Sequence, residues 1–506
     1  MTAGRILGLA ALCTLSGCSL LLDTDEFLAV PVLGDVRIDS REPMQALEGA
    51  RLPVILRGEG FSTNATVRAI VALPGGAEES VLVAEKRASR DGTALALLLD
   101  VPVLPGHAAA DELASVQITV TQGRSTASAT LDLTGLSELK VASEDNQVVN
   151  AAELENLYSE IVLEGAVTVI GDDPVRLVAT NTIRIDRPIE ASGQDATAEQ
   201  PGSGGPGGCP GGAGGVAGVD SGNGKNGGCD QGGGRAGTGV SGVGPAPSGG
   251  GGGCAAAAGD DGDQAHGDDT CTPELVPLGQ PDNRGHGGGG GGAYESAGGG
   301  HGGGGGGVVE LSAPIVSFGP YGELSARGGQ GTPGAPLDCG QDRHAGSGGG
   351  GSGGVVLLRA DKVLFSQEGI ISVAGGTGGI ICETSGGPGS DGRVRIDVAS
   401  IQLNGRPISA PETMVDFFSR NVLRGPRLAD TPQLAVSDAV LIGVRGDPEV
   451  TYDLLVDSSP PVAISGNQTL MLELEPGLRG VCVALRGVIP NSPESKHCLT
   501  IAVLDP

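Results

Sequence analysis

The chain of 506 residues contains no tryptophan, and only 2% of its residues are aromatic. Aromatic side chains usually anchor ligand pockets and stacking platforms, so their scarcity argues against such sites. Basic residues are also few, because 31 Lys and Arg stand against 60 Asp and Glu, for a net charge of -29. Such a chain repels phosphate backbones, which argues against a nucleic-acid partner. After the first 30 residues no apolar run reaches the roughly 20 residues that a membrane-spanning helix needs.

The first 18 residues predict a targeting segment, which is set aside from the fold. Arg5 supplies a positive flank, and an apolar stretch runs from Ile6 to Leu15. The sequence Leu15-Ser16-Gly17-Cys18 resembles a bacterial lipobox. The resemblance implies cleavage before Cys18 and lipidation of that residue, and Ser19 favours sorting to the outer membrane. An ordinary secretory signal with an incidental cysteine is the alternative.

Residues 307–410 contain one pattern three times, in which a glycine run leads into a strand, an alanine and a second strand. The strands begin at Val308, Val355 and Val394, and a weaker copy begins at Val175. Units of a few short strands cannot bury a core alone, so stacking into a parallel β-helix is expected. In that arrangement Ala179, Ala313, Ala360 and Ala399 form one corner ladder.

The region from Ile161 to Gly193 resembles the opening of glycine-rich β-helix proteins exported by myxobacteria-like Gram-negative bacteria. The resemblance rests on Ile161-Val162-Leu163-Glu164-Gly165, Pro174-Val175-Arg176-Leu177-Val178-Ala179 and Ile189-Glu190-Ala191-Ser192-Gly193. That family is known by its pattern more than by a function. The resemblance therefore implies a scaffold and does not indicate a molecular activity.

Alternating apolar residues at both ends of the chain predict two further β domains of the sandwich type. In the first, Arg57-Gly58-Glu59-Gly60-Phe61 and Asp100-Val101-Pro102 resemble IPT/TIG immunoglobulin-like domains. The predicted fold class is therefore all-β, with a glycine-rich parallel β-helix between two sandwich-like domains. The expected boundaries are a signal peptide at 1–18, a tether at 19–29, a sandwich at 30–135, a connector at 136–157, the β-helix at 158–410 and a second sandwich at 411–506.

Residues 195–306 interrupt the β-helix and hold 45 of the 93 glycines. A flexible low-complexity linker is one interpretation. The other is a set of extended helices of about three residues per turn, packed side by side because glycine has no side chain. Cross-links would help such packing, since ordering glycine costs the most backbone entropy.

The cysteines support an exported protein. Once Cys13 and Cys18 are set aside, an even number remains, without the CxxC pairs typical of zinc sites, and disulfides are expected. The candidates are Cys209, Cys229, Cys254, Cys271, Cys339, Cys382, Cys482 and Cys498. Loops that leave the β-helix at the same corner would bring Cys339 to Cys382, and neighbouring strands would bring Cys482 to Cys498.

Other polar residues give weaker signals. An acidic loop offers possible calcium ligands, but its spacing fits no calcium motif and a solvated turn is favoured; the residues are Asp260, Asp261, Asp263, Asp268 and Asp269. The histidines His286, His301, His344 and His497 are expected at the surface. The strand charges are expected to be scattered rather than to share a ladder position; they are Glu310, Arg359, Asp361, Lys362, Arg393, Arg395 and Asp397.

The sequence therefore favours a non-enzymatic lipoprotein of the outer membrane or cell surface, acting as a structural or adhesive display scaffold. The lipid anchor would hold it in the outer membrane, on the periplasmic side or at the cell surface. Its expected partners are the membrane, through the lipid, and extracellular polysaccharide or other surface proteins, with no cofactor. One alternative is a carbohydrate-active enzyme of the pectate-lyase type, for which the fold alone is weak evidence. The other is a calcium-dependent adhesin, which depends on the acidic loop.

Overall fold

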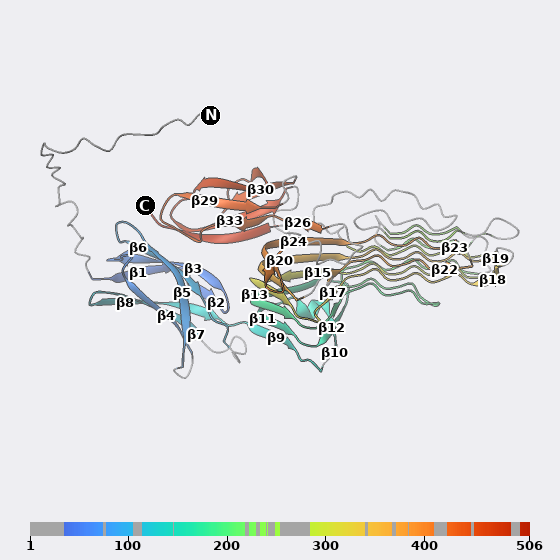
Figure 1. The fold of residues 1–506 in the computed structure, drawn as a ribbon, viewed down its shortest axis with the longest axis horizontal. Helices are drawn as coiled ribbons and strands as arrows, with labels where there is room; N and C mark the ends of the chain where they lie inside the picture. Colours follow the sequence, from blue (N-terminus) through green and yellow to red (C-terminus); the bar gives the residue numbers. More distant parts are fainter. Residues whose placement is uncertain are drawn as a thin grey trace, which may run out of the picture.

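The computed structural model describes residues 35–73, 77–104, 114–144, 146–217, 222–228, 233–238, 240, 248–253, 284–339, 343–366, 371–382, 384–408, 422–446, 450–486 and 496–505. The chain is all-β, as predicted, and its strands form several sheets (Figure 1). Among the described residues the helical structure is one short 3-10 helix, η1 (Ala151–Leu154), which Asn150 caps by accepting a hydrogen bond from the Ala152 backbone N–H.

The N-terminal β domain is one eight-stranded sheet around a single apolar core, in the order β1-β3-β6-β5-β4-β7-β8-β2. Leu95, Leu97 and Leu99 lie on the core side of β6, and Ala96 and Leu98 lie on its opposite side. Both sides of β6 are covered, which explains why this strand is apolar throughout. The strands are β1 (Arg37–Glu42), β2 (Gln45–Leu47), β3 (Arg51–Glu59), β4 (Thr66–Ala72), β5 (Glu78–Ala88), β6 (Ala94–Asp100), β7 (Ala114–Gln122) and β8 (Ser125–Thr134).

The middle of the chain forms two sheets of mainly parallel strands that share one core. The five-stranded sheet has the order β10-β12-β14-β17-β21, with β10 (Asn146–Asn150), β12 (Ala166–Ile170), β14 (Ile189–Glu190), β17 (Leu324–Ser325) and β21 (Ile371–Ser372). The nine-stranded sheet has the order β25-β24-β20-β15-β13-β11-β9, with β16 and β26 beside this path. Its strands are β9 (Ser137–Val141), β11 (Leu157–Leu163), β13 (Val175–Ile185), β15 (Val308–Ser312), β16 (Ile315–Phe318), β20 (Val355–Phe365), β24 (Arg393–Leu403), β25 (Arg406–Pro407) and β26 (Val422–Arg424).

The repeated segments of the sequence lie next to one another in the nine-stranded sheet. Val175 pairs with Val309, Val309 with Val356, and Val356 with Val394, all in parallel strands. These four valines have no exposed surface and form one ladder in the core. Stacked β-branched residues pack well on a pleated surface, which stabilises the register between neighbouring strands.

The predicted alanine ladder is correct at three of its four positions. The register that pairs Val178 with Ser312 and Ser312 with Arg359 aligns Ala179, Ala313 and Ala360, which are all buried. The prediction was wrong for the fourth, because Ala360 pairs with Val398, and Ala399 is exposed. The last strand is displaced by one residue relative to the sequence alignment, and in a strand such a displacement reverses the face on which a side chain lies.

The parallel sheets also begin earlier in the chain than the sequence suggests. Strand β9 pairs with β11, and β10 pairs with β12, although both lie in the segment assigned to a connector. At the other end, β25 pairs antiparallel with β24 and so turns back instead of adding to the five-stranded sheet.

The C-terminal β domain has a three-stranded sheet, β27-β29-β32, and a five-stranded sheet, β28-β34-β33-β30-β31, with an apolar core of residues from both. This is compatible with the predicted sandwich. A further cluster joins Leu434, Ala502 and Leu504 to β3 and β6, so the two end domains pack together. The strands are β27 (Arg427–Ala429), β28 (Leu434–Ala435), β29 (Ala439–Arg445), β30 (Thr451–Val456), β31 (Val462–Ser465), β32 (Gln468–Glu473), β33 (Gly477–Leu485) and β34 (Lys496–Val503).

Candidate functional site

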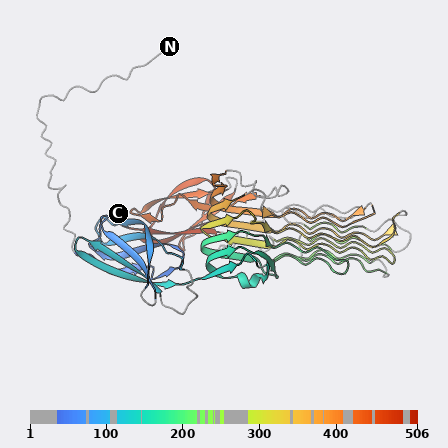
Figure 2. The ribbon, with the colours of Figure 1, turned by 60° about the horizontal axis from the view of Figure 1, so that its bottom comes forward.

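Extended glycine-rich segments leave the parallel sheets after β14, β17 and β21 and return before β15, β20 and β24. Figures 1 and 2 show them lying side by side and projecting away from both end domains. We call the described residues within 191–307, 326–354 and 373–392 the glycine bundle. Two short hairpins lie within it, formed by β18 (Pro336–Asp338) with β19 (Arg343–His344) and by β22 (Ile380–Ile381) with β23 (Thr384–Ser385).

Backbone hydrogen bonds in the glycine bundle repeat every three residues. In the segment 298–307, the N–H groups of Gly299, Gly302 and Gly305 donate to the carbonyl groups of Gly215, Gly212 and Cys209. The N–H groups one residue further on, of Gly300, Gly303 and Gly306, donate instead to Gly346, Gly349 and Ser352. Successive residues therefore face different neighbours, which is the geometry of an extended helix with about three residues per turn.

The segments lie too close together for side chains at their buried positions. A Cβ atom added to Gly302 would overlap the Gly288 carbonyl group, and one added to Gly303 would overlap that of Gly329. Of the two interpretations of the insertion, ordered extended packing is therefore confirmed for its described residues. The glycine content follows from this packing, because the backbone of one segment occupies the space where a neighbouring side chain would lie.

Both specific disulfide predictions are confirmed. Cys339 and Cys382 form a disulfide between two loops of the bundle, and their Cα atoms are 5.4 Å apart. Cys482 and Cys498 pair directly across β33 and β34 and form the second. Cys209 is also disulfide-bonded. The remaining candidates Cys229, Cys254 and Cys271 lie outside the described residues.

The expectation of exposed histidines in the glycine runs was wrong. His286 and His344 are buried, with 5% and 1% of their surfaces exposed. His301 is partly buried, and its Nδ1 accepts a hydrogen bond from the Gly214 backbone N–H at 3.0 Å. Burial lowers the pKa of His301, so the neutral ring that accepts this bond is favoured. These rings fill space inside the bundle.

Several strand charges predicted to be scattered form one network on the outer face of the nine-stranded sheet. The Arg395 guanidinium donates to both carboxylate oxygens of Asp397, at 2.8 and 2.6 Å. Arg359 lies between two acids, with its Nη1 3.2 Å from Glu310 Oε1 and its Nε 3.8 Å from Asp397 Oδ2. Arg176 extends the network, since its Nε lies 4.0 Å from Glu310 Oε2.

The register explains this network. Glu310, Leu357 and Arg395 occupy one ladder, and Ser312, Arg359 and Asp397 occupy the ladder two residues further on. Residues two apart in a strand share a face, so Glu310 and Arg359 meet diagonally across neighbouring strands. Arg359 and Asp397 are direct partners, as are Arg176 and Glu310. Arg393 is also buried, and burial lowers its pKa. Lys362 lies further along β20, where it pairs with Ser400.

Arg427 at the start of β27 connects this network to the C-terminal domain. Its Nη1 donates to the Asp397 carbonyl group at 3.0 Å, and its Nη2 contacts the Asp361 carboxylate. Burial lowers the pKa of Arg427 to about 10. His497 lies next to it and was wrongly expected at the surface: burial, with Arg427 and Arg359 nearby, lowers its pKa to about 3. The neutral His497 ring accepts the Leu428 backbone N–H at 3.2 Å.

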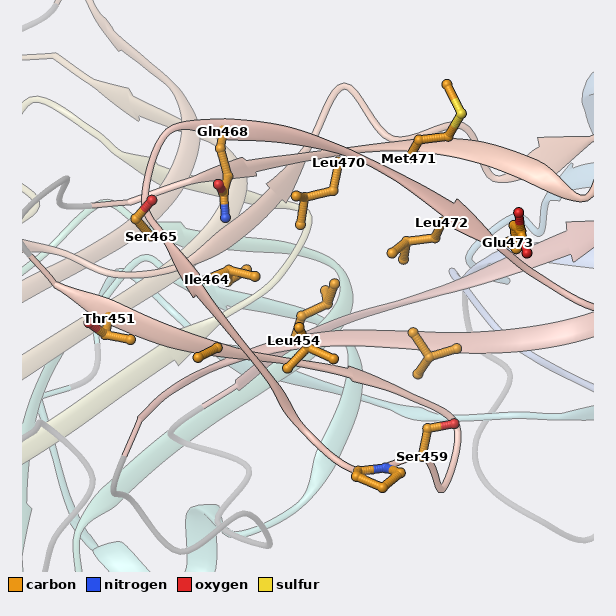
Figure 3. Close-up of a pocket in the computed structure, with 14 residues that line it drawn as sticks. Thr451, Leu454, Ser459, Ile464, Ser465, Gln468, Leu470, Met471, Leu472 and Glu473 are labelled. Carbon is orange, nitrogen blue, oxygen red and sulfur yellow. The ribbon is translucent and has the colours of Figure 1, made fainter.

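The C-terminal domain also has a groove of about 640 Å³ between β31 and β32 (Figure 3). Leu454, Ile464, Leu470 and Leu472 are among its lining residues, and Glu473 is its charged residue. The groove was not predicted from the sequence, since each strand by itself has the ordinary pattern of a sandwich strand.

The remaining predicted sites are not described by the structure. Cys18 and the acidic residues Asp260, Asp261, Asp263, Asp268 and Asp269 lie outside the described residues. Within the described part of the chain, no group of three or more His, Cys, Asp or Glu side chains is arranged to hold a metal ion. No helix there is long and apolar enough to cross a membrane.

Comparison with protein-family models, curated proteins and solved structures found no match for this chain.

Proposed function

We propose that this protein is a non-enzymatic lipoprotein of the outer membrane or cell surface, anchored through Cys18, which displays the glycine bundle as a structural or adhesive element. The parallel sheets form the coils of a β-helix in this proposal, and the bundle segments are its loops. Extracellular polysaccharide or other surface proteins are the expected partners.

The observation that carries the proposal is the bundle itself. Its segments are joined by backbone hydrogen bonds and project from the end of the sheets opposite the two β domains (Figure 1). The first described strand, β1, belongs to the N-terminal domain, so an anchor at the N-terminus would leave the bundle at the far end of the molecule. A disulfide adds a covalent link between two bundle loops. An ordered projection of this kind suits a spacer or an adhesive tip.

The buried charges give no support to the enzyme alternative. A glycosidase needs two carboxyl groups that flank the bond to be cleaved and are open to sugar. Here Asp397 is held by Arg395, Glu310 lies against Arg359, and both acids are buried. Their arrangement fits attachment of the C-terminal domain to the sheet.

Labelling of intact cells tests the display role. Val216 in the bundle and Leu82 in the N-terminal domain are 69% and 64% exposed, so Val216→Cys and Leu82→Cys place thiols at both ends of the molecule. We expect a membrane-impermeant maleimide to label both variants above the unsubstituted protein on whole cells. Labelling of both only after lysis would contradict surface display. Cys18→Ser separately tests the anchor, because loss of the lipid should move the protein from the membrane to the soluble fraction.

A further inference from the structure

The groove between β31 and β32 is bounded by two edge strands. Among the described residues, β31 is the last strand of the five-stranded sheet and pairs with β30 alone, and β32 is the last of the three-stranded sheet and pairs with β29 alone. An edge strand presents backbone N–H and C=O groups that no neighbouring strand of its sheet uses. A peptide in an extended conformation can form backbone hydrogen bonds with such a row of groups.

The two strands separate although the link between them is very short. Only Gly466 and Asn467 join them, and Asn467 has a positive φ of 56°. Two-residue links with positive φ usually join strands that pair as a hairpin. Here each strand instead joins a different sheet, so the groove narrows toward this turn and opens toward Ser459 and Glu473 (Figure 3).

The floor of the groove is apolar and follows the period of a strand. Leu470 and Leu472 point into the space between the sheets, toward Leu454 and Ile464 (Figure 3). Met471 is also among the lining residues, but its side chain points away from this space. Exposure along β32 alternates in the same way, because Leu470 and Leu472 are partly buried and Met471 is 69% exposed. A strand placed in the groove would meet this floor with every second side chain.

The groove carries little of the charge that usually protects an edge, although Pro460 is among its lining residues and β31 is short. Edge strands commonly carry lysine or an inward-pointing charge that prevents pairing with another chain. The lining residues include no lysine or arginine, and their one charge is Glu473, which is exposed at the open end. A carboxylate in that position favours a cation on the incoming chain.

We propose that the groove binds an extended peptide segment of a partner protein, with apolar side chains at alternate positions and a lysine or arginine beside Glu473. The peptide adds a strand to the edge of β31 or β32, and its apolar side chains cover Leu470 and Leu472. This site is separate from the bundle and does not depend on the display role.

The test uses the whole protein and a blocked heptapeptide, Lys-Val-Thr-Val-Thr-Val-Lys, carrying a fluorophore. We expect saturable binding, and about tenfold weaker binding to Leu470→Lys or Leu472→Lys, since the added cation lies on the apolar floor. Met471→Lys is the matched control on the same strand and should change the affinity less than about twofold, within the effect of a surface charge.

Exchange of the charge tests the pairing of Glu473 with a cation of the peptide without changing the floor. Glu473→Lys should weaken the lysine peptide about threefold and strengthen a peptide with glutamate at both ends. A peptide with proline in place of the central valine should not bind, because it lacks the N–H and the strand geometry. Thermal melting would reveal whether Leu470→Lys fails to fold. In that case the peptide preference of Glu473→Lys still tests whether the groove binds the peptide.

Three results would overturn the proposal. They are absence of binding to the unsubstituted protein, equal weakening by Met471→Lys and Leu470→Lys, or an unchanged peptide preference after Glu473→Lys. Sedimentation measures the oligomeric state and so tests a second copy of the chain as the occupant. A dimer that becomes monomeric in Leu470→Lys would assign the groove to that second copy.

Discussion

The glycine bundle and the parallel sheets belong to the same stretch of chain, but different groups hold them together. In the sheets, apolar side chains such as Val309, Leu358 and Val394 fill a core without exposed surface. In the bundle, backbone atoms meet backbone atoms, and an added Cβ overlaps a neighbouring carbonyl group at Gly302 and Gly303. Sheet stability therefore depends on buried apolar area, and bundle stability on close approach and hydrogen bonds.

This difference implies that the arrangement of the bundle depends on the sheets more than the sheets depend on the bundle. The bundle segments begin and end at strands of the sheets, so sheet register determines which segments become neighbours. The core of the sheets is built mainly from strand residues, and only the ends of bundle segments, at Ala191, Ala326 and Val373, contribute to it among the described residues. We expect damage to the bundle to stay local and damage to the sheets to spread into the bundle.

The largest effect is expected from Gly302→Ala. The new Cβ overlaps the Gly288 carbonyl group, and relief would require two segments to move apart, at a cost of roughly 5 kcal/mol. Hydrogen exchange should show lost protection across the bundle while β7 and β33 keep theirs. The matched control is Gly298→Ala in the same segment, where the nearest atom is the Gly215 carbonyl oxygen at 3.7 Å. Equal effects of both substitutions would argue against close packing as the reason for glycine.

Removal of the bundle disulfide should be the next largest effect. Cys339 and Cys382 are 43 residues apart, so the double change to serine should destabilise the protein by about 4 kcal/mol through the entropy of the unfolded chain. The Cys482–Cys498 disulfide spans 16 residues and should contribute about 3 kcal/mol. Denaturant titration of each double variant measures the loss in free energy of unfolding for each disulfide. A larger loss of stability on removal of Cys482–Cys498 than of Cys339–Cys382 would contradict this expectation.

A core substitution tests whether damage spreads from the sheets. Leu358 on β20 is fully buried in the core that the two parallel sheets share. Leu358→Ala should lower the free energy of unfolding by about 3 kcal/mol, through lost contacts and the cavity that remains. Hydrogen exchange should increase in the sheets and in the bundle together. Protection retained in the bundle alone would show that the bundle folds independently, contrary to the proposed dependence.

The smallest effect concerns acid. The unfolded chain takes up a proton at His497 near its ordinary pKa of 6.5, but the folded protein does so only near 3. The stability that depends on neutral His497 is therefore fully present above pH 6.5 and is lost as the pH falls toward 3, by about 2 kcal/mol between pH 7 and 5. Thermal melts of the parent and of His497→Asn should converge at low pH. A parallel pH dependence of both proteins would assign the effect to other groups.

Much of the architecture follows from local patterns. Alternation in the segments that begin at Val308 and Val355 predicts strands, and their repetition predicts that they stack in one sheet. The pairing of Cys339 with Cys382 follows from loops that leave neighbouring strands on the same side. These inferences succeed because the strand period and the repeat are both visible in the sequence.

Other features depend on register or on distant segments. Aligning the repeats at Val355 and Val394 misplaced Ala399 by one position, because Val394 pairs with Val356 instead. That register also brings Arg359 and Asp397 together, which no single strand reveals. His497 is covered by a neighbouring part of the fold, and the β31–β32 groove exists because two adjacent strands join different sheets.

The three-residue repeat of the bundle has a consequence for how such a chain changes in length. Inserting one residue into the segment 298–307 would rotate every later residue of the segment by about a third of a turn, so that each would face a different neighbouring segment. Inserting three would restore each residue to its neighbour and lengthen the segment by about 9 Å. The projection is thus able to grow or shrink in whole turns, provided that adjoining segments change by the same step.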